Sequence, residues 1–190
     1  MRNLKKLLAL VLAMVMAFSL MLTANAAVKY DDYQDKDSIT DEFDEGVRVL
    51  TGLEVMQGDE KGFRPSDKIT RAEAAAVIYR AVTGDVTDRQ TALYKDYGTF
   101  TDVKSDDWFA GYVGYCQNAG YIKGTSPTTF QPYGQVTGYE VLAMILRAVG
   151  YGKNNEFTGG SWQVNVAALA KQLGVTRNVV AAHMDQTLNM

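Results

Sequence analysis

The sequence FRPSDKITRAEAAAVIYRAV at residues 63–82 indicates a fold built from repeats, because a related sequence, FQPYGQVTGYEVLAMILRAV, occupies residues 130–149. The two stretches lie 67 positions apart along their whole length. Each begins with Phe-x-Pro, continues with Thr-x-x-Glu and ends in an apolar segment. Similarity at a fixed spacing indicates a chain built from copies of one structural unit.

A helix is predicted to begin at the Thr-x-x-Glu sequence of each copy, at residues 70–73 and 137–140. In this capping box the threonine hydroxyl accepts from an amide of the first turn, and the glutamate accepts from the threonine amide. Gly84 and Gly150 are typical of helix ends. The expected apolar stripes are Val77, Ile78, Ala81 and Val82 in copy one, and Met144, Ile145, Ala148 and Val149 in copy two.

A further helix is expected before each glycine turn, and it reveals a third copy. Residues 108–120 and 162–174 both run from tryptophan to glycine, 54 positions apart. Each copy therefore reads as helix, glycine turn, extended segment and second helix, and neighbouring copies must pack together to bury their stripes. The motif threonine of copy three would fall at position 191, so the sequence predicts an incomplete third copy and a fragment of a longer surface protein.

The first 26 residues are predicted to be a signal peptide. Three basic residues precede an apolar run at 7–22, and Ala24-Asn25-Ala26 is typical of a cleavage site. A membrane anchor is the alternative, because the run is near the lower limit for a span. No later stretch is as long and apolar, so the mature protein is not expected to be an integral membrane protein.

Charge and cysteine content argue against several classes of partner. The net charge is −3, and it becomes −6 without the three basic residues of the signal peptide, so nucleic acid is not an expected partner. Cys116 lies in an apolar helical stretch, which favours a buried thiol. One cysteine and one histidine exclude most zinc sites, and the acidic tract at 31–44 lacks the glycine of a calcium loop. We expect no metal and no cofactor.

These motifs resemble the surface-layer homology (SLH) repeat. Phe63-x-Pro65 followed by Ile69-Thr70-Arg71-Ala72-Glu73 is similar to its second half, and residues 100–108 and 120–124 are similar to its first half. The resemblance implies a mostly α fold, with tandem helix–loop–helix repeats packed as a pseudo-threefold helical bundle and the last repeat incomplete. The predicted boundaries are signal peptide 1–26, repeat one 27–84, linker 85–96, repeat two 97–152 and partial repeat three 153–190.

The resemblance implies a non-enzymatic, exported protein held non-covalently on the bacterial cell wall. The implied ligand is secondary cell-wall polysaccharide, often pyruvylated. Arg71 could bind a pyruvyl carboxylate with its planar fork, beside free amides at a helix start. The other implied contacts are Thr70, Asp102 as an acceptor of sugar hydroxyls, and Trp108 and Trp162 as apolar plates.

Each of these residues also has a structural interpretation. Arg71 could be a solvated residue paired with Glu73 or Asp67, Asp102 could cap the first helix of its copy, and Trp108 could fill the core. Copy two departs from the family pattern, because Gly138 stands where copy one has Arg71. The adjacent Tyr139 is a further candidate for stacking on a sugar.

Three other functions are possible. The chain could be a structural or interaction module of a surface protein that binds no sugar. Residues 166–183 have the spacing of a helix-turn-helix, although the acidic charge and the predicted export oppose DNA binding. A glycoside hydrolase would need a pair of carboxylates in a separate domain, and the repeats leave no residues for one.

Overall fold

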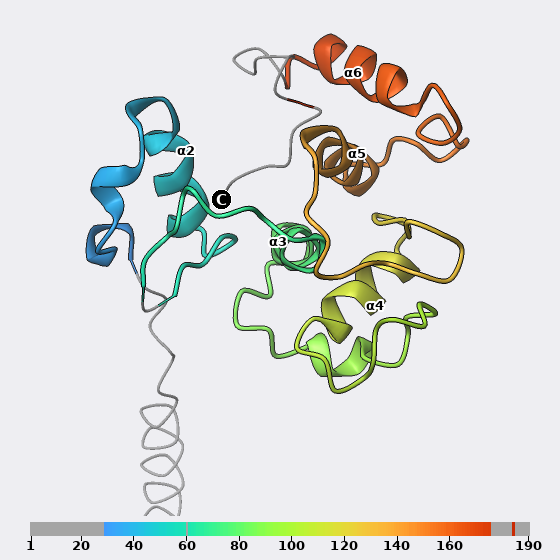
Figure 1. The fold of residues 1–190 in the computed structure, drawn as a ribbon, viewed down its shortest axis with the longest axis horizontal. Helices are drawn as coiled ribbons and strands as arrows, with labels where there is room; N and C mark the ends of the chain where they lie inside the picture. The colour runs from blue at the N-terminus through green and yellow to red at the C-terminus, as the bar shows by residue number, and fades with distance from the viewer. Residues whose placement is uncertain (1–28, 60, 176–183, 185–190) are drawn as a thin grey trace, which may run out of the picture.

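The described part of the chain, residues 29–59, 61–175 and 184 of the computed structural model, is helical and contains no strands (Figure 1). The α-helices are α2 (Asp41–Gly52), α3 (Arg71–Thr83), α4 (Ala110–Asn118), α5 (Gly138–Ala148) and α6 (Trp162–Gln172). Three short 3-10 helices accompany them: η1 (Tyr30–Asp32), η2 (Lys36–Ser38) and η3 (Thr91–Tyr94). The predicted mostly α fold is confirmed. Among these residues no helix has the length and apolar character needed to cross a membrane.

The second helices of copies one and two begin in the same way. Thr70 and Thr137 have nearly identical backbone angles, with φ of −87° and −88° and ψ of 163° in both. Both capping boxes are complete, as the Thr-x-x-Glu pattern predicted. Gly84 ends α3 in the left-handed conformation at φ +69°, and Gly150 lies one residue beyond the cap of α5.

The first helices of all three copies end in the same way. Each is followed by a residue of positive φ, at +57°, +78° and +73° for Glu54, Gly120 and Gly174. The next amide then donates to the carbonyl five residues earlier, at 2.8–3.0 Å. A left-handed residue that turns the chain out of a helix in this way is a common helix-ending motif. The conformation therefore supports the alignment of the copies.

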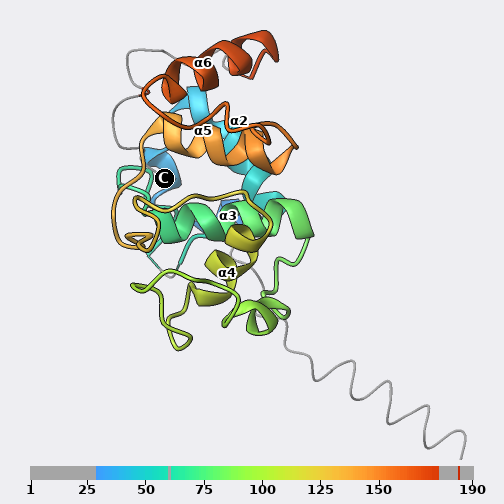
Figure 2. The same ribbon diagram turned by 90° about the vertical axis from the view of Figure 1, so that its right-hand side faces the viewer.

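Helix packing runs between copies. Helix α3 packs on α4, the first helix of copy two, and α5 packs on α6, the first helix of copy three (Figures 1 and 2). The α3–α4 interface holds the largest apolar cluster and the α5–α6 interface holds a second. Helix α2 has a cluster of its own, formed by Tyr33, Ile39, Val47 and Phe63. Each second helix thus buries its apolar side against the copy that follows it.

The predicted apolar stripes are partly wrong. Ile78, Met144 and the flanking alanines of α3 are buried, but Val82, Ile145 and Val149 are exposed. Helix α3 is covered by α4 and by α5, so it is buried on several sides rather than along one stripe. Its run of alanines suits this position, because small side chains allow two helices to approach the same backbone.

Cys116 is a buried thiol, as its apolar surroundings predicted. It lies in the α3–α4 interface with no exposed surface, and its Sγ is 3.5 Å from the carbonyl oxygen of Ala75. Burial raises the pKa of Cys116 to about 12, because the thiolate would lose its hydration. The thiol is therefore a packing group of the interface.

The segment predicted as a linker, 85–96, packs against α4 through η3. Gly111 and Gly114 allow this approach, because a Cβ atom on either would overlap the backbone carbonyl of Thr91 or Tyr94. The Tyr94 ring also contacts Tyr115 of α4, with centroids 5.0 Å apart. The segment is therefore part of the folded unit of copy two.

Gly114→Ala is expected to lower the free energy of unfolding by about 1–3 kcal/mol, because the added methyl group forces η3 away from α4. Gly46→Ala in α2 is the matched control. It adds the same group to a helix with no atom within 4 Å of the new Cβ, and should raise stability by about 1 kcal/mol. Urea unfolding followed by circular dichroism measures both changes. Equal effects of the two substitutions would contradict the packing of the linker on α4.

Candidate functional site

The N-terminus of α3 is docked into copy two by backbone hydrogen bonds. The amides of Arg71 and Ala72 donate to the carbonyls of Gly134 and Pro132, at 2.8 and 2.9 Å. The Thr70 hydroxyl accepts from the Glu73 amide and donates to the Glu73 carboxylate. The first-turn amides are therefore occupied, and the expectation that free amides stand ready for an anion here is wrong.

The Arg71 side chain also holds α3 to copy two. We call this contact between the N-terminus of α3 and copy two the joint. Nε of Arg71 donates to the Phe130 carbonyl at 2.7 Å, Nη2 to the Lys123 carbonyl at 2.8 Å and Nη1 to Oε1 of Glu140 at 2.8 Å. The guanidinium also lies 4.8 Å from the centre of the Phe130 ring. All these partners belong to copy two. The pairing with Glu73 or Asp67 within copy one that we considered is therefore wrong.

Arg71 is also buried, with 4% of its surface exposed. Burial lowers the pKa of its guanidinium, while Glu140 and Asp102 act in the opposite direction. A buried cation needs its partners, since an uncompensated charge inside a protein is costly. The structure therefore gives Arg71 a role in joining the copies, and ligand binding by Arg71 stays a prediction.

Asp102 fastens the extended segment of copy two. Its two oxygens accept from the amides of Phe130 and Gln131, at 2.8 and 2.7 Å. Asp35 makes the same pair of bonds to residues 63 and 64 in copy one, at 2.9 and 2.6 Å. Neither of our interpretations, a sugar contact or a cap of the first helix, describes these bonds. Because the same two bonds occur in both copies, we interpret this aspartate as a structural residue that holds the extended segment of the repeat in place.

Trp108 lies on the surface, with 54% of its area exposed, so the interpretation as a core residue is wrong. Its ring meets the edge of buried Phe109, with centroids 5.4 Å apart. Tyr133, which is 70% exposed, packs on Phe109 at the same separation. We call Trp108 and Tyr133 the aromatic edge. Tyr133 was not predicted from the sequence, where its only signal is its position directly after the Phe-x-Pro group.

Trp162 is set differently from Trp108. It is half-buried and packs against the α5–α6 cluster. Its position at the start of α6 matches the repeat, but its ring contributes to packing in copy three. The two tryptophans are therefore not equivalent as surface contacts.

The N-terminus of α5 is occupied by Met184 in place of an arginine. A Cβ on Gly138 would lie 2.9 Å from Sδ of Met184, and the Tyr139 amide donates to the Met184 carbonyl at 3.2 Å. Ala72, the counterpart of Tyr139, donates to Pro132 in the same manner. Met184 thus takes the place at α5 that the extended segment of copy two takes at α3. Glycine at 138 leaves the room that this arrangement needs.

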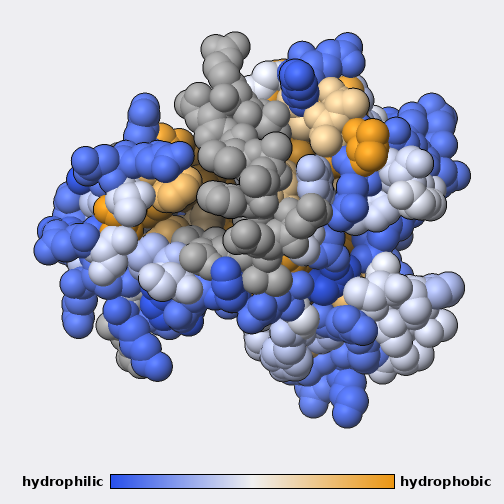
Figure 3. All heavy atoms as spheres, turned by 45° about the horizontal axis from the view of Figure 1, so that its top comes forward, coloured by the Kyte–Doolittle hydropathy of each residue, from blue (hydrophilic) through white to orange (hydrophobic). Residues whose placement is uncertain are grey.

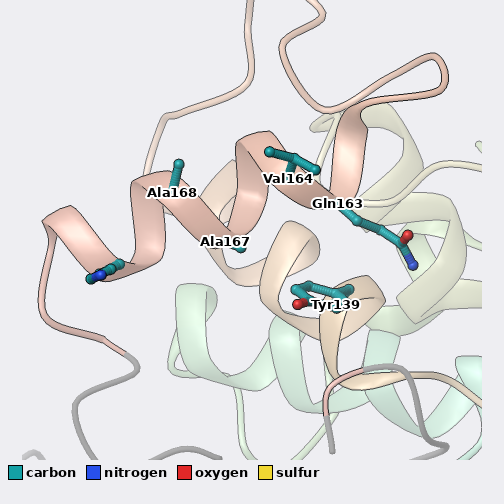
Figure 4. Close-up of a pocket in the computed structure, with 6 residues that line it drawn as sticks. Tyr139, Gln163, Val164, Ala167 and Ala168 are labelled. Atoms are coloured by element: carbon teal, nitrogen blue, oxygen red, sulfur yellow. The ribbon is translucent and has the colours of Figure 1, made fainter. Parts of the chain in front are cut away.

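Tyr139 faces a shallow cleft of about 420 Å³ on one side of α6 (Figure 4). Val164, Ala167 and Ala168 are half of its six lining residues, and Lys171 adds a cation. The face drawn in Figure 3 is mostly hydrophilic, with smaller hydrophobic areas between the polar side chains. The predicted helix-turn-helix at 166–183 begins in α6, and its second half, 176–183, lies outside the described residues.

These observations define a class of protein: a helical repeat module whose copies interlock through a Thr-x-x-Glu helix start. The profile of the S-layer homology domain matches residues 32–75 and 99–141, which end within the first turns of α3 and α5. The chain belongs to the S-layer homology family.

Curated relatives show the same likeness. The Middle cell wall protein of Brevibacillus brevis is 35% identical over 134 residues, which are 70% of this chain and 12% of that protein. The Surface layer protein of Brevibacillus choshinensis is 31% identical over 183 residues, 96% of this chain and 16% of that protein. The Amylopullulanase of Thermoanaerobacterium thermosulfurigenes is 29% identical over 142 residues, 68% of this chain and 7% of that protein. The chain therefore spans less than a fifth of the length of these relatives.

Arg71→Ala is expected to lower the free energy of unfolding by about 3–5 kcal/mol, because it leaves Glu140 and two carbonyls of copy two without their partner. Arg64→Ala is the control, since Arg64 pairs with Asp59 and Asp67 at the surface, and its loss should cost about 1 kcal/mol or less. Chemical denaturation of both variants provides the comparison. Similar losses would show that the Arg71 network does not join the copies.

Proposed function

We propose that the chain anchors an exported protein non-covalently to the bacterial cell wall by binding secondary cell-wall polysaccharide. Membership of the S-layer homology family and relatives named as cell-wall and surface-layer proteins support this anchoring role. In this proposal the module carries no catalytic activity of its own. The amylopullulanase relative is compatible with this, because the matching segment is a small share of that protein.

The observation that carries the proposal is the exposure of the aromatic edge. Trp108 and Tyr133 both pack on buried Phe109, and about half or more of each residue remains exposed to solvent. Fixed aromatic rings offer apolar faces at a low cost in conformational entropy, which suits stacking against the CH face of a sugar.

The aromatic edge adjoins the joint between the copies. Tyr133 is followed by Gly134, whose Cα hydrogens lie beside the Arg71 side chain and whose carbonyl accepts from the Arg71 amide. In our proposal a pyruvyl carboxylate takes the place of half-exposed Glu140 on Nη1 of Arg71. Thr70 and Asp102 hold the helix start and the extended segment in position, and Trp162 supports α6.

Trp108→Ala is expected to weaken retention on purified cell walls by about tenfold, the equivalent of the ~1.4 kcal/mol that one ring contact contributes. Because the ring is exposed, the fold should be unaffected. Tyr97→Ala is the matched control, since Tyr97 is 55% exposed and contacts only Tyr94 among the ring pairs of the described residues. Co-sedimentation with purified walls measures both. Retention that survives Trp108→Ala unchanged would exclude the aromatic edge as the contact.

Walls with and without pyruvyl groups test the nature of the ligand. Stronger retention on pyruvylated walls is the expected result, because only these offer the ketal carboxylate to Arg71. Equal retention on both would contradict the carboxylate contact and leave the anchoring role standing. An absence of retention on either wall would instead favour the alternative, an interaction module of a surface protein that binds no sugar.

A further inference from the structure

A cationic cleft of about 640 Å³ opens between the ends of α4 and α5. Its lining contains Lys123, Arg147 and Lys153, and it contains no carboxylate. Arg147 is half-buried, and its Nη2 donates to the Phe157 carbonyl at 3.1 Å. Over the part of the chain that the structure describes, none of the three cations has an acidic partner within 4 Å. We call this the Arg147 cleft.

The corresponding region, around the ends of α2 and α3, contains an equivalent arginine whose charge is neutralised by a carboxylate. Arg80 corresponds to Arg147, 67 positions earlier, and its Nε and Nη2 donate to the two oxygens of Asp88 at 3.0 and 2.7 Å. The counterpart of Asp88 is Asn155, and the two residues share a positive φ, +57° and +63°. The same backbone position therefore carries a carboxylate in the segment after α3 and a neutral amide in the segment after α5.

The two lysines have neutral counterparts in copy one. Lys123 corresponds to Gln57, and Lys153 to Val86. The Gln57 side-chain amide donates to the Val86 carbonyl at 2.9 Å and closes the gap between the two segments. These positions, with the arginine and its partner, carry one positive and one negative charge around the ends of α2 and α3, but three positive charges around the ends of α4 and α5.

The helix ends beside the cleft do not account for this charge. A helix C-terminus carries a partial negative charge, so a cation near α4 and α5 would be favourable on that ground alone. However, α2 and α3 end beside the corresponding positions, where Arg80 is the single cation and Glu54, Asp85 and Asp88 bring the net charge to −2. Burial lowers the pKa of Arg147, which reflects the cost of a guanidinium that has no carboxylate to offset its lost hydration.

We propose that the Arg147 cleft binds an anionic group, a carboxylate or a phosphate, that takes the place of the carboxylate Asp88 provides in copy one. The Arg147 fork contacts two of its oxygens, the two ammonium groups add charge from either side, and the Asn155 amide donates a further hydrogen bond. Lys123 links this cleft to the joint, because its carbonyl accepts from Arg71 and the residue is part of the cleft lining. The site goes beyond the proposed function, since it requires no wall polymer.

A nuclear magnetic resonance titration of the purified chain tests this site, with inorganic phosphate and sodium pyruvate as separate probes at constant ionic strength. We expect saturable shifts of the amides of residues 119–124 and 147–155. Asn155→Asp restores the carboxylate of copy one and should pair with Arg147. It should weaken binding by at least about tenfold, the change expected for losing one charge-assisted contact.

Gln172→Glu is the matched control, because it adds the same charge at the exposed end of α6 and should leave binding within about twofold. A preference for phosphate or for pyruvate would identify which anionic group the cleft takes. The proposal is overturned if the wild-type chain shows no saturable shifts there, or if Asn155→Asp binds as the wild type does. Equal weakening by both variants would also overturn it. Because the probes are small anions, these results do not depend on retention by cell walls.

Discussion

The N-terminus of α3 is inserted into copy two, and the packing of the other helices follows from this contact. Two amides of its first turn donate hydrogen bonds to carbonyls of copy two, and the Arg71 side chain donates three more to that copy. A helix start has orphan amides that must find acceptors. Here the capping box satisfies part of them, and the neighbouring copy satisfies the rest.

This joint explains why helices pair across copies. Once α3 begins inside copy two, its length runs along α4 rather than along the helix of its own copy. The same arrangement places α5 on α6. The sequence repeat and the packing unit are therefore out of phase by half a copy. Stability in such an array resides in the interfaces between copies, so copies one and two should unfold together rather than independently.

The fold could be predicted from the sequence because its determinants are local and occur twice. The Thr-x-x-Glu caps and the helix-ending glycines each depend on a few neighbouring residues, and the structure has them where the sequence placed them. The apolar stripes were predicted less well. Their assignment assumed one buried face per helix, whereas α3 is enclosed by partners that lie far away in the sequence.

The candidate site was less predictable for the same physical reason. Arg71 was correctly placed at the first position of α3, but its partners, from Lys123 to Glu140, come from another copy and no local pattern reveals them. The double amide contact of Asp102 likewise spans 28 residues. Trp108 could be recognised as a candidate, yet only the packing around Phe109 shows that its ring remains exposed.

Comparison of the two joints shows how one scaffold supports different surfaces. At α3 the joint contains an arginine that reaches into the next copy, whereas at α5 glycine admits Met184 to the same place. The helix start is preserved in both because the capping box depends on Thr and Glu, not on the residue between them. At the C-terminal ends of these helices the positive charge is instead greater at α5. Arg80 of α3 is neutralised by Asp88, whereas Arg147 of α5 lines a cleft together with the neutral Asn155. Residues that hold the backbone are thus repeated in copies one and two, and the charged side chains around them are free to differ. The capping boxes and the aspartate contacts do not involve Arg147, Lys123 or Lys153 side chains, so an unneutralised cationic cleft is compatible with the fold that the two copies share.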